Sequence, residues 1–200
     1  MKKKHFIALL ATAVMTVSCG TMGTGLLTTD TLSSLGDVIV SVLGINKINE
    51  NTLYGTWNYA GPGCAFTTDD LLAKAGGEVA AKKIEDQLLP HYQTLGINSS
   101  NTAFAFNQDK TFVAKVAGKS FKGNYNFDPS TGSIALQTLL ITLNGYVTRN
   151  TSGISLLFES QKVLTILQML GGISGNTTIA AIGEISKNYD GVRIGFDLRR

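Results

Sequence analysis

The sequence contains few of the residues that reactive and metal-binding sites require. Beyond its first residues, the only histidine is His91, which follows Pro90 at a predicted helix end. Common zinc sites need three or four nitrogen, sulfur or carboxylate ligands. There is no Gly-x-Ser-x-Gly motif, so a Ser-His-Asp site would lack its nucleophile elbow. We therefore expect no metal ion, no other cofactor and no catalytic residue.

Basic residues are not clustered either. The lysines at positions 2–4 account for the whole formal charge of +3. Without residues 1–18 the chain is formally neutral, and its densest basic pairs are at 82–83 and 199–200. Such a pattern does not favour a nucleic-acid-binding surface.

No apolar stretch is long enough to cross a membrane as a helix. The uncharged run from Phe6 to Val17 is too short for a hydrocarbon core of roughly 30 Å, but it suits a secretory signal. It ends at Thr16-Val17-Ser18-Cys19, which resembles the lipobox of bacterial lipoproteins with Thr in place of the usual Leu. The resemblance implies that residues 1–18 are removed and that Cys19 is acylated. Ordinary cleavage and secretion of a soluble protein is the alternative.

Lipidation of Cys19 leaves Cys64 as the only free thiol and excludes an intrachain disulfide. As a nucleophile, Cys64 would need His91 as its base, so a buried structural thiol is the preferred interpretation. Surface-exposed lipoproteins of some gut anaerobes carry acidic residues directly after the lipidated cysteine, whereas the first one here is Asp30. By this analogy we expect attachment to the outer membrane, facing the periplasm.

The chain divides into a signal at 1–18, a tether with an amphipathic helix at 19–50, and a folded domain at 51–200. In the tether, apolar residues recur at helical spacing from Leu32 to Leu43. This apolar stripe packs either on its own domain or on a partner protein of the envelope.

The folded domain contains both strand and helix patterns. A first strand, with Trp57 and Tyr59 on one face, is expected to end at Gly61-Pro62-Gly63. A long helix is expected over 67–89, started by Thr67 with Asp70 and ended by Pro90. Six strands follow, at about 102–107, 111–118, 121–127, 133–138, 140–148 and 153–158. Two helical stretches come next, at about 159–170 and 177–187, and a last strand is expected at 191–199.

This order predicts a mainly β fold with inserted helices. The eight strands form an antiparallel up-and-down barrel, with a long helix after the first strand and a helical pair before the last. In the last strand, Val192, Ile194, Phe196 and Leu198 alternate with polar residues and glycine. A barrel of this size is either filled by side chains or holds one small ligand.

Gly55-Thr56-Trp57 resembles the Gly-x-Trp signature of lipocalins. Further motifs resemble lipocalin-like bacterial lipoproteins of unassigned function, of the type found in Gram-negative gut anaerobes, over most of residues 50–200. These motifs are Cys64-x-Phe66, Ala75-Gly76-Gly77, Phe104 to Phe106, Phe112, Gly123-x-Tyr125, Leu157-Phe158 and Tyr189 to Phe196. The resemblance implies a lipocalin-like barrel in which an Arg of the last strand packs over the signature Trp. Arg193 and Arg199 lie on the other face of that strand, so neither is expected to make this contact.

Nine aromatic residues are the candidate lining of the barrel, namely Trp57, Phe104, Phe106, Phe112, Tyr125, Phe127, Tyr146, Phe158 and Phe196. They either fill the interior as a core, which is preferred, or surround a ligand cavity. The expected function is non-catalytic binding or carriage of a small hydrophobic ligand by a lipid-anchored protein of the cell envelope. The alternative is a structural or assembly module that docks on another envelope protein.

Overall fold

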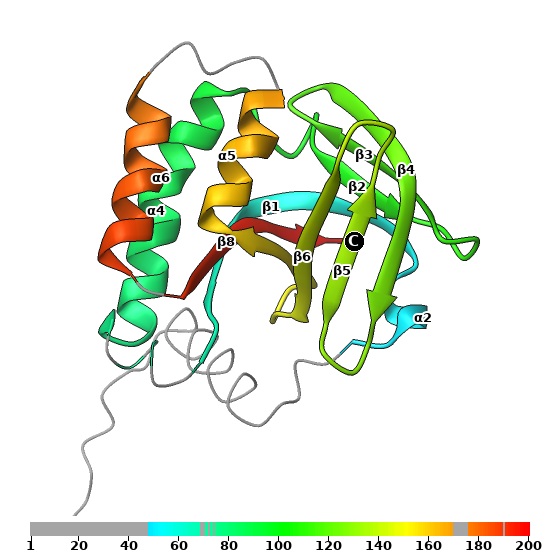
Figure 1. The fold of residues 1–200 in the computed structure, drawn as a ribbon, viewed down its shortest axis with the longest axis horizontal. Coiled ribbons are helices and arrows are strands. Elements are labelled where there is room, and N and C mark those ends of the chain that lie inside the picture. The colour runs from blue at the N-terminus through cyan, green and yellow to red at the C-terminus, as the bar shows by residue number, and fades with distance from the viewer. Residues whose placement is uncertain (1–47, 69–70, 72, 74, 170–175, 190) are drawn as a thin grey trace, which may run out of the picture.

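The computed structural model describes residues 48–200, except 69–70, 72, 74, 170–175 and 190. The predicted signal, Cys19 and the predicted helix at 32–43 lie outside the described residues. Eight strands form one closed barrel whose order follows the sequence, and every neighbouring pair is antiparallel (Figure 1). The predicted up-and-down barrel is thus confirmed.

The predicted order of strands and helices is also confirmed. The strands are β1 (Gly55–Phe66), β2 (Ala103–Phe106), β3 (Thr111–Val116), β4 (Lys119–Asp128), β5 (Ser133–Gln137), β6 (Thr142–Arg149), β7 (Ile154–Glu159) and β8 (Val192–Arg199). The helices are α2 (Glu50–Leu53), α4 (Glu78–Thr94), α5 (Ser160–Met169) and α6 (Asn176–Asn188). The short helix α2, directly before β1, is not predicted from the sequence.

Strand residues alternate between the interior and the outside of the barrel. In β8, Ile194, Phe196 and Leu198 are at most 1% exposed. In β3, Phe112 is buried, whereas its neighbour Val113 is 47% exposed. Because side chains in a strand point alternately to its two faces, this pattern places one apolar set in the core.

β1 is longer than predicted and runs through Gly61-Pro62-Gly63. It pairs with β2 over Gly55–Asn58 and with β8 over Asn58–Phe66, with a register shift after Tyr59. Beyond Asn58, β1 pairs with β8 on one side and with no strand on the other. β1 is therefore an edge strand at Pro62, where a residue without a backbone N–H is tolerated. Gly63 is needed for close packing, since a Cβ there would lie 2.6 Å from Oδ1 of Asp197.

The predicted helix at 67–89 is interrupted. The Leu71 N–H donates to Oγ1 of Thr68 at 3.3 Å, so Thr68 rather than Thr67 caps the first turn. Gly76 and Gly77, with φ of +106° and +73°, then separate this turn from α4. These positive φ angles suit glycine, which has no Cβ to clash.

Pro90 does not end the helix but lies inside α4, which continues to Thr94. A proline in a helix removes one backbone hydrogen bond. Here Leu88 and Tyr92, on either side of Pro90, are fully buried. Their packing keeps the last turns of α4 against the sheet in spite of the lost bond.

The helices α4, α5 and α6 form a layer beside the barrel (Figure 1). α4 contacts β1, α5 contacts β7 and β8, and α6 contacts both other helices. Their buried apolar residues, such as Ile84, Val163 and Ile182, join the core of the barrel. Among the described residues, no helix has the length and apolar character needed to cross a membrane.

Candidate functional site

The predicted aromatic lining is buried almost completely. Eight of its nine members are at most 4% exposed, the exception being Tyr146. Their rings contact one another, with centroids 5.4 Å apart for Phe104 and Phe196 and 5.3 Å apart for Phe106 and Tyr125. Tyr92 of α4, which the sequence pattern did not single out, adds a ring 5.6 Å from Phe196. The helix layer therefore helps to fill the barrel.

Tyr146 does not line the interior, contrary to the prediction. It stands between the buried Gly145 and Val147 on β6, so its side chain points to the outside of the barrel. There, Cζ of Arg193 lies 3.2 Å from the centroid of its ring, and burial lowers the pKa of Arg193. Tyr146 and Arg193 thus cover the outer surface of the sheet.

The described residues leave a small apolar slot of about 40 Å³ in the barrel. Phe104, Phe112, Phe158 and Phe196 line it, together with Ile166 of α5. Ligand pockets usually measure about 300–1,000 Å³, whereas roughly 10–15 Å³ admits a single water. The slot therefore accommodates only the end of a ligand, and the barrel is filled, as the preferred interpretation of the aromatic residues expected.

The slot lies beside an exposed apolar loop between β5 and β6. Thr138 lines the slot, and the next two residues, Leu139 and Leu140, are 100% and 89% exposed. Oγ1 of Thr138 accepts hydrogen bonds from the N–H groups of Leu140 and Ile141, so the loop is ordered by its backbone. Leu140 was predicted to start a strand, but β6 begins at Thr142. The result is an apolar rim in contact with water.

At the other end of the barrel, Arg200 packs over the signature Trp57. Its Cζ lies 4.4 Å from the centroid of the indole, and its Nη2 donates to the carbonyl oxygens of Thr52 and Tyr54 at 2.7 Å each. Nε1 of Trp57 donates to the Leu53 carbonyl at 2.8 Å. The contact implied by the lipocalin resemblance is therefore present, made by Arg200. The alternation of β8 could have revealed it, since residue 200 continues the series 192, 194, 196 and 198.

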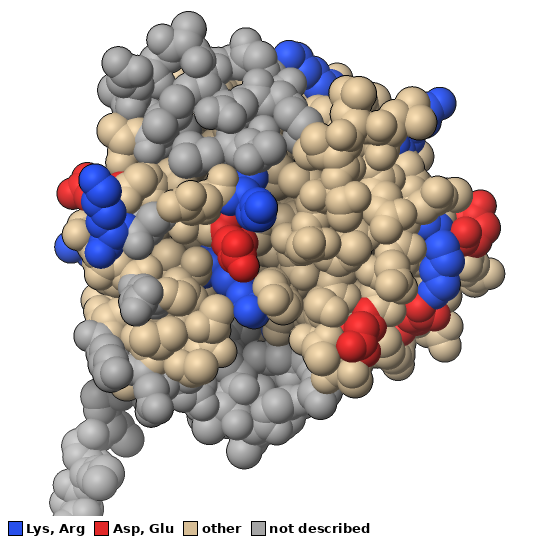
Figure 2. Space-filling view, in the orientation of Figure 1, with Lys and Arg blue, Asp and Glu red and all other residues tan. Residues whose placement is uncertain are grey.

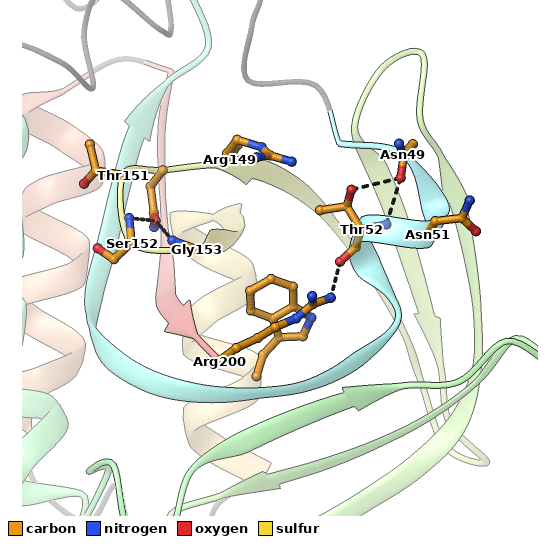
Figure 3. A pocket seen from close by; sticks show the side chains of 10 residues that line it. Asn49, Asn51, Thr52, Arg149, Thr151, Ser152, Gly153 and Arg200 are labelled. Atoms are coloured by element: carbon orange, nitrogen blue, oxygen red, sulfur yellow. Dashed lines mark hydrogen bonds between the residues drawn. The ribbon is translucent and has the colours of Figure 1, made fainter.

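A polar crevice of about 590 Å³ adjoins this contact (Figure 3). Asn49, Asn51 and Thr52 form one wall, and the turn from Arg149 to Gly153 forms another. Trp57 and Arg200 lie between them. Of these residues, only Trp57 is a site residue predicted from the sequence. Three segments far apart in the sequence form the crevice, so no local motif could have indicated it.

Between β1 and α4, two half-buried titratable groups, Cys64 and Glu85, lie near each other. Burial raises the pKa of the Cys64 thiol, which disfavours the reactive thiolate and supports the interpretation of a structural cysteine. Burial and the nearby Asp197 raise the pKa of Glu85 to about 7. Asp197 in turn accepts a hydrogen bond from Oγ of Ser155 at 2.6 Å. This region thus holds a pH-sensitive carboxyl group and a thiol that is not activated.

Charged side chains on the face in Figure 2 are scattered among uncharged residues. Lys82 pairs with Asp86 at 2.9 Å, and Lys110 pairs with Glu50. In each of these pairs a positive side chain is offset by a negative one.

The chain is similar to a solved structure and to a protein family. A solved structure of a DUF4847 family protein from Bacteroides vulgatus ATCC 8482 is 12% identical to this chain, covers 56% of this chain and 90% of its own, and has a TM-score of 0.34. No curated protein matches the chain. The family model described as lipocalin-like domain (DUF4923) matches residues 28–200. A lipocalin-like barrel is a fold that can hold a small ligand. The chain belongs to the DUF4923 family of lipocalin-like domains.

Proposed function

We propose that this protein is a non-catalytic, lipid-anchored binding protein of the cell envelope that takes the end of a small hydrophobic ligand at the mouth of its barrel. The observation that carries the proposal is the apolar slot with Leu139 and Leu140 exposed beside it. Covering a leucine side chain stabilises by about 1.5–3 kcal/mol. A ligand that enters the slot and covers both leucines therefore gains binding free energy from the rim as well as from the slot.

The anchor in this proposal rests on the pattern that ends at Cys19, and the periplasmic face of the outer membrane is the expected location. Two or three acyl chains give stable attachment, since each buried methylene contributes about 0.8 kcal/mol. A Cys19→Ser variant is expected to lose the lipid and leave the membrane fraction. A variant that stays membrane-bound would show that Cys19 is not the anchor.

The alternative is a structural or assembly module that docks on another envelope protein. The filled interior favours it, because a slot of about 40 Å³ cannot enclose a whole ligand. On this alternative, Leu139 and Leu140 would contact a protein.

A titration with a fluorescent fatty-acid probe, together with native mass spectrometry of extracted material, separates the two functions. Ala114 faces the slot, and its neighbour Val113 points outward, so Ala114→Phe fills the slot and Val113→Phe is the matched control. We expect Ala114→Phe to weaken probe binding at least tenfold, while Val113→Phe leaves it unchanged.

Overpacking can destabilise a core, so a second variant is needed. Replacing both Leu139 and Leu140 by serine removes the rim without touching the interior, and is also expected to weaken probe binding. Absence of probe binding and of any extracted apolar compound in the unaltered protein would overturn the carrier function and favour docking.

A further inference from the structure

The crevice beside Trp57 has the size of a small-molecule site. Its volume is about 590 Å³, within the usual range of about 300–1,000 Å³ and far larger than the slot of about 40 Å³. It lies at the opposite end of the barrel from the exposed leucines. β6 demonstrates this separation, because Leu143 near its start lines the slot and its last residue, Arg149, lines the crevice.

The lining of the crevice combines positive charge with neutral hydrogen-bonding groups. Arg149 and Arg200 line it, and none of the ten lining residues is acidic. The neutral polar side chains are those of Asn49, Asn51, Thr52, Asn150, Thr151 and Ser152. Guanidinium groups bind carboxylate and phosphate in a bidentate manner, and amides and hydroxyls pair with hydroxyl groups.

Arg200 is held in position before any ligand arrives. Its guanidinium stacks on Trp57, and Nη2 donates to the two carbonyls of Thr52 and Tyr54. Among the described residues, these carbonyls are its hydrogen-bond acceptors, so the donors on Nε and Nη1 remain for a ligand. A guanidinium that is already fixed loses little conformational entropy on binding an anion.

The wall that carries Arg149 is also ordered. Oδ1 of Asn150 accepts from the N–H groups of Ser152 and Gly153 at 3.0 and 2.7 Å, and its Nδ2 donates to Ser155 at 3.0 Å. Figure 3 shows the Arg149 side chain extending from this wall toward α2. On the α2 side, Oδ1 of Asn49 accepts from the backbone and the hydroxyl of Thr52. Both walls are therefore formed without a ligand.

The floor of the crevice excludes ligands that need an aromatic platform. Trp57 is only 4% exposed, because Arg200 covers its ring. A nucleobase or a flat apolar ring would find no open indole surface for stacking. The site instead presents two cations and six amide- or hydroxyl-bearing side chains.

We propose that the crevice binds a small acidic sugar, a molecule that carries one carboxylate or phosphate together with several hydroxyl groups. The oxyanion pairs with Arg200 and Arg149, and the hydroxyls bond to the asparagine, serine and threonine side chains. This site is separate from the apolar mouth, so the failure of one proposal leaves the other intact.

Calorimetric titration of the mature protein at low salt tests this site with four probes: galacturonate, glucose 6-phosphate, glucose and inorganic phosphate. We expect at least one acidic sugar to bind with a Kd of about 1 mM or tighter, and glucose and phosphate to bind at least tenfold more weakly. The two acidic sugars distinguish a carboxylate ligand from a phosphate ligand. Binding should weaken as salt is added.

Arg149→Gln is the main variant, because Arg149 is exposed and glutamine keeps a polar side chain of similar length without the charge. We expect it to weaken binding of the acidic sugar at least tenfold. Arg200→Lys keeps the charge but loses the planar fork, and should also weaken binding. Arg199→Gln is the matched control, since Arg199 is exposed and does not line the crevice, and it should leave binding unchanged.

Three outcomes would overturn the proposal. The first is no saturable binding of either acidic sugar, and the second is unchanged binding in both Arg149→Gln and Arg200→Lys. The third is binding of glucose or inorganic phosphate as tight as that of the acidic sugars, which would remove the need for the charge or for the hydroxyls.

Discussion

The two ends of β6 lie in chemically opposite surroundings. Leu143 borders an apolar slot beside two exposed leucines, whereas Arg149, roughly 20 Å away along the strand, borders a polar crevice. At the crevice end, named hydrogen bonds connect Arg200 and Trp57 to residues 52–54. At the slot end, side-chain packing fills the barrel. Hydrogen bonds therefore stabilise the crevice end of the barrel, whereas apolar packing stabilises the slot end.

The largest effect is expected at a core residue that lines the slot. Phe196 contacts Phe104, Tyr92 and Tyr59, with ring centroids 5.4–6.2 Å apart. Phe196→Ala should lower the free energy of unfolding by about 3–5 kcal/mol, because the cavity cannot fully collapse. Urea denaturation measures this change. Val113→Ala, on the outer face, should change it by less than about 0.5 kcal/mol, and a similar loss in both variants would contradict the prediction.

A smaller effect is expected from pH, and it comes from Glu85 of α4 rather than from either end of the barrel. The pKa of Glu85 is raised to about 7 in the folded protein, above its usual value of 4.5, so the folded state binds this proton more tightly than the unfolded state. Stability contributed by the neutral carboxyl is therefore complete below about pH 4.5 and lost as the pH rises to about 7. The loss is roughly 2 kcal/mol, reduced from the full shift because the side chain is 23% exposed.

Thermal unfolding between pH 4 and pH 8 measures this dependence. Glu85→Gln, which stays neutral, should flatten the decline, while Glu184→Gln at an exposed position of α6 should not. An equal decline in the unaltered protein and in Glu85→Gln would show that another group is responsible.

The smallest effect should be confined to the crevice end. Arg200→Met removes two hydrogen bonds and the stacked cation, and should destabilise by about 1–2 kcal/mol. Hydrogen exchange should become faster for the amides of residues 52–57 and stay unchanged for β5 and the start of β6. Faster exchange at both ends would show that the two ends are not independent.

The sequence predicts the barrel well because alternation is a local signal. The buried series from Val192 to Leu198 was assigned correctly from its period of two. Predictions were wrong where tertiary contacts override local chemistry. Gly61-Pro62-Gly63 continues a strand because one side of β1 carries no ladder there, and Pro90 stays in a helix because Leu88 and Tyr92 are buried.

The candidate sites were less predictable than the fold. The aromatic residues indicated an apolar interior, but only the packed side chains give the volume of about 40 Å³ that remains. The crevice depends on Asn49, Arg149 and Arg200, which come together only when the barrel closes. Tyr146 was predicted to point into the barrel, but it points outward, and its neighbour Val147 points inward.

The pairing of β1 with β8 also has a consequence for how the chain folds. It joins Asn58 to Arg199, the first and last parts of the barrel, while every other ladder connects strands that follow each other in the sequence. Non-local ladders carry the largest loop-closure entropy and form late. Until this seam closes, β1 and β8 both present unpaired edges that invite pairing with another chain. Pairing of β1 with β8 is therefore expected to limit the folding rate. Once these strands have paired, the chain should no longer be prone to aggregate through their edges.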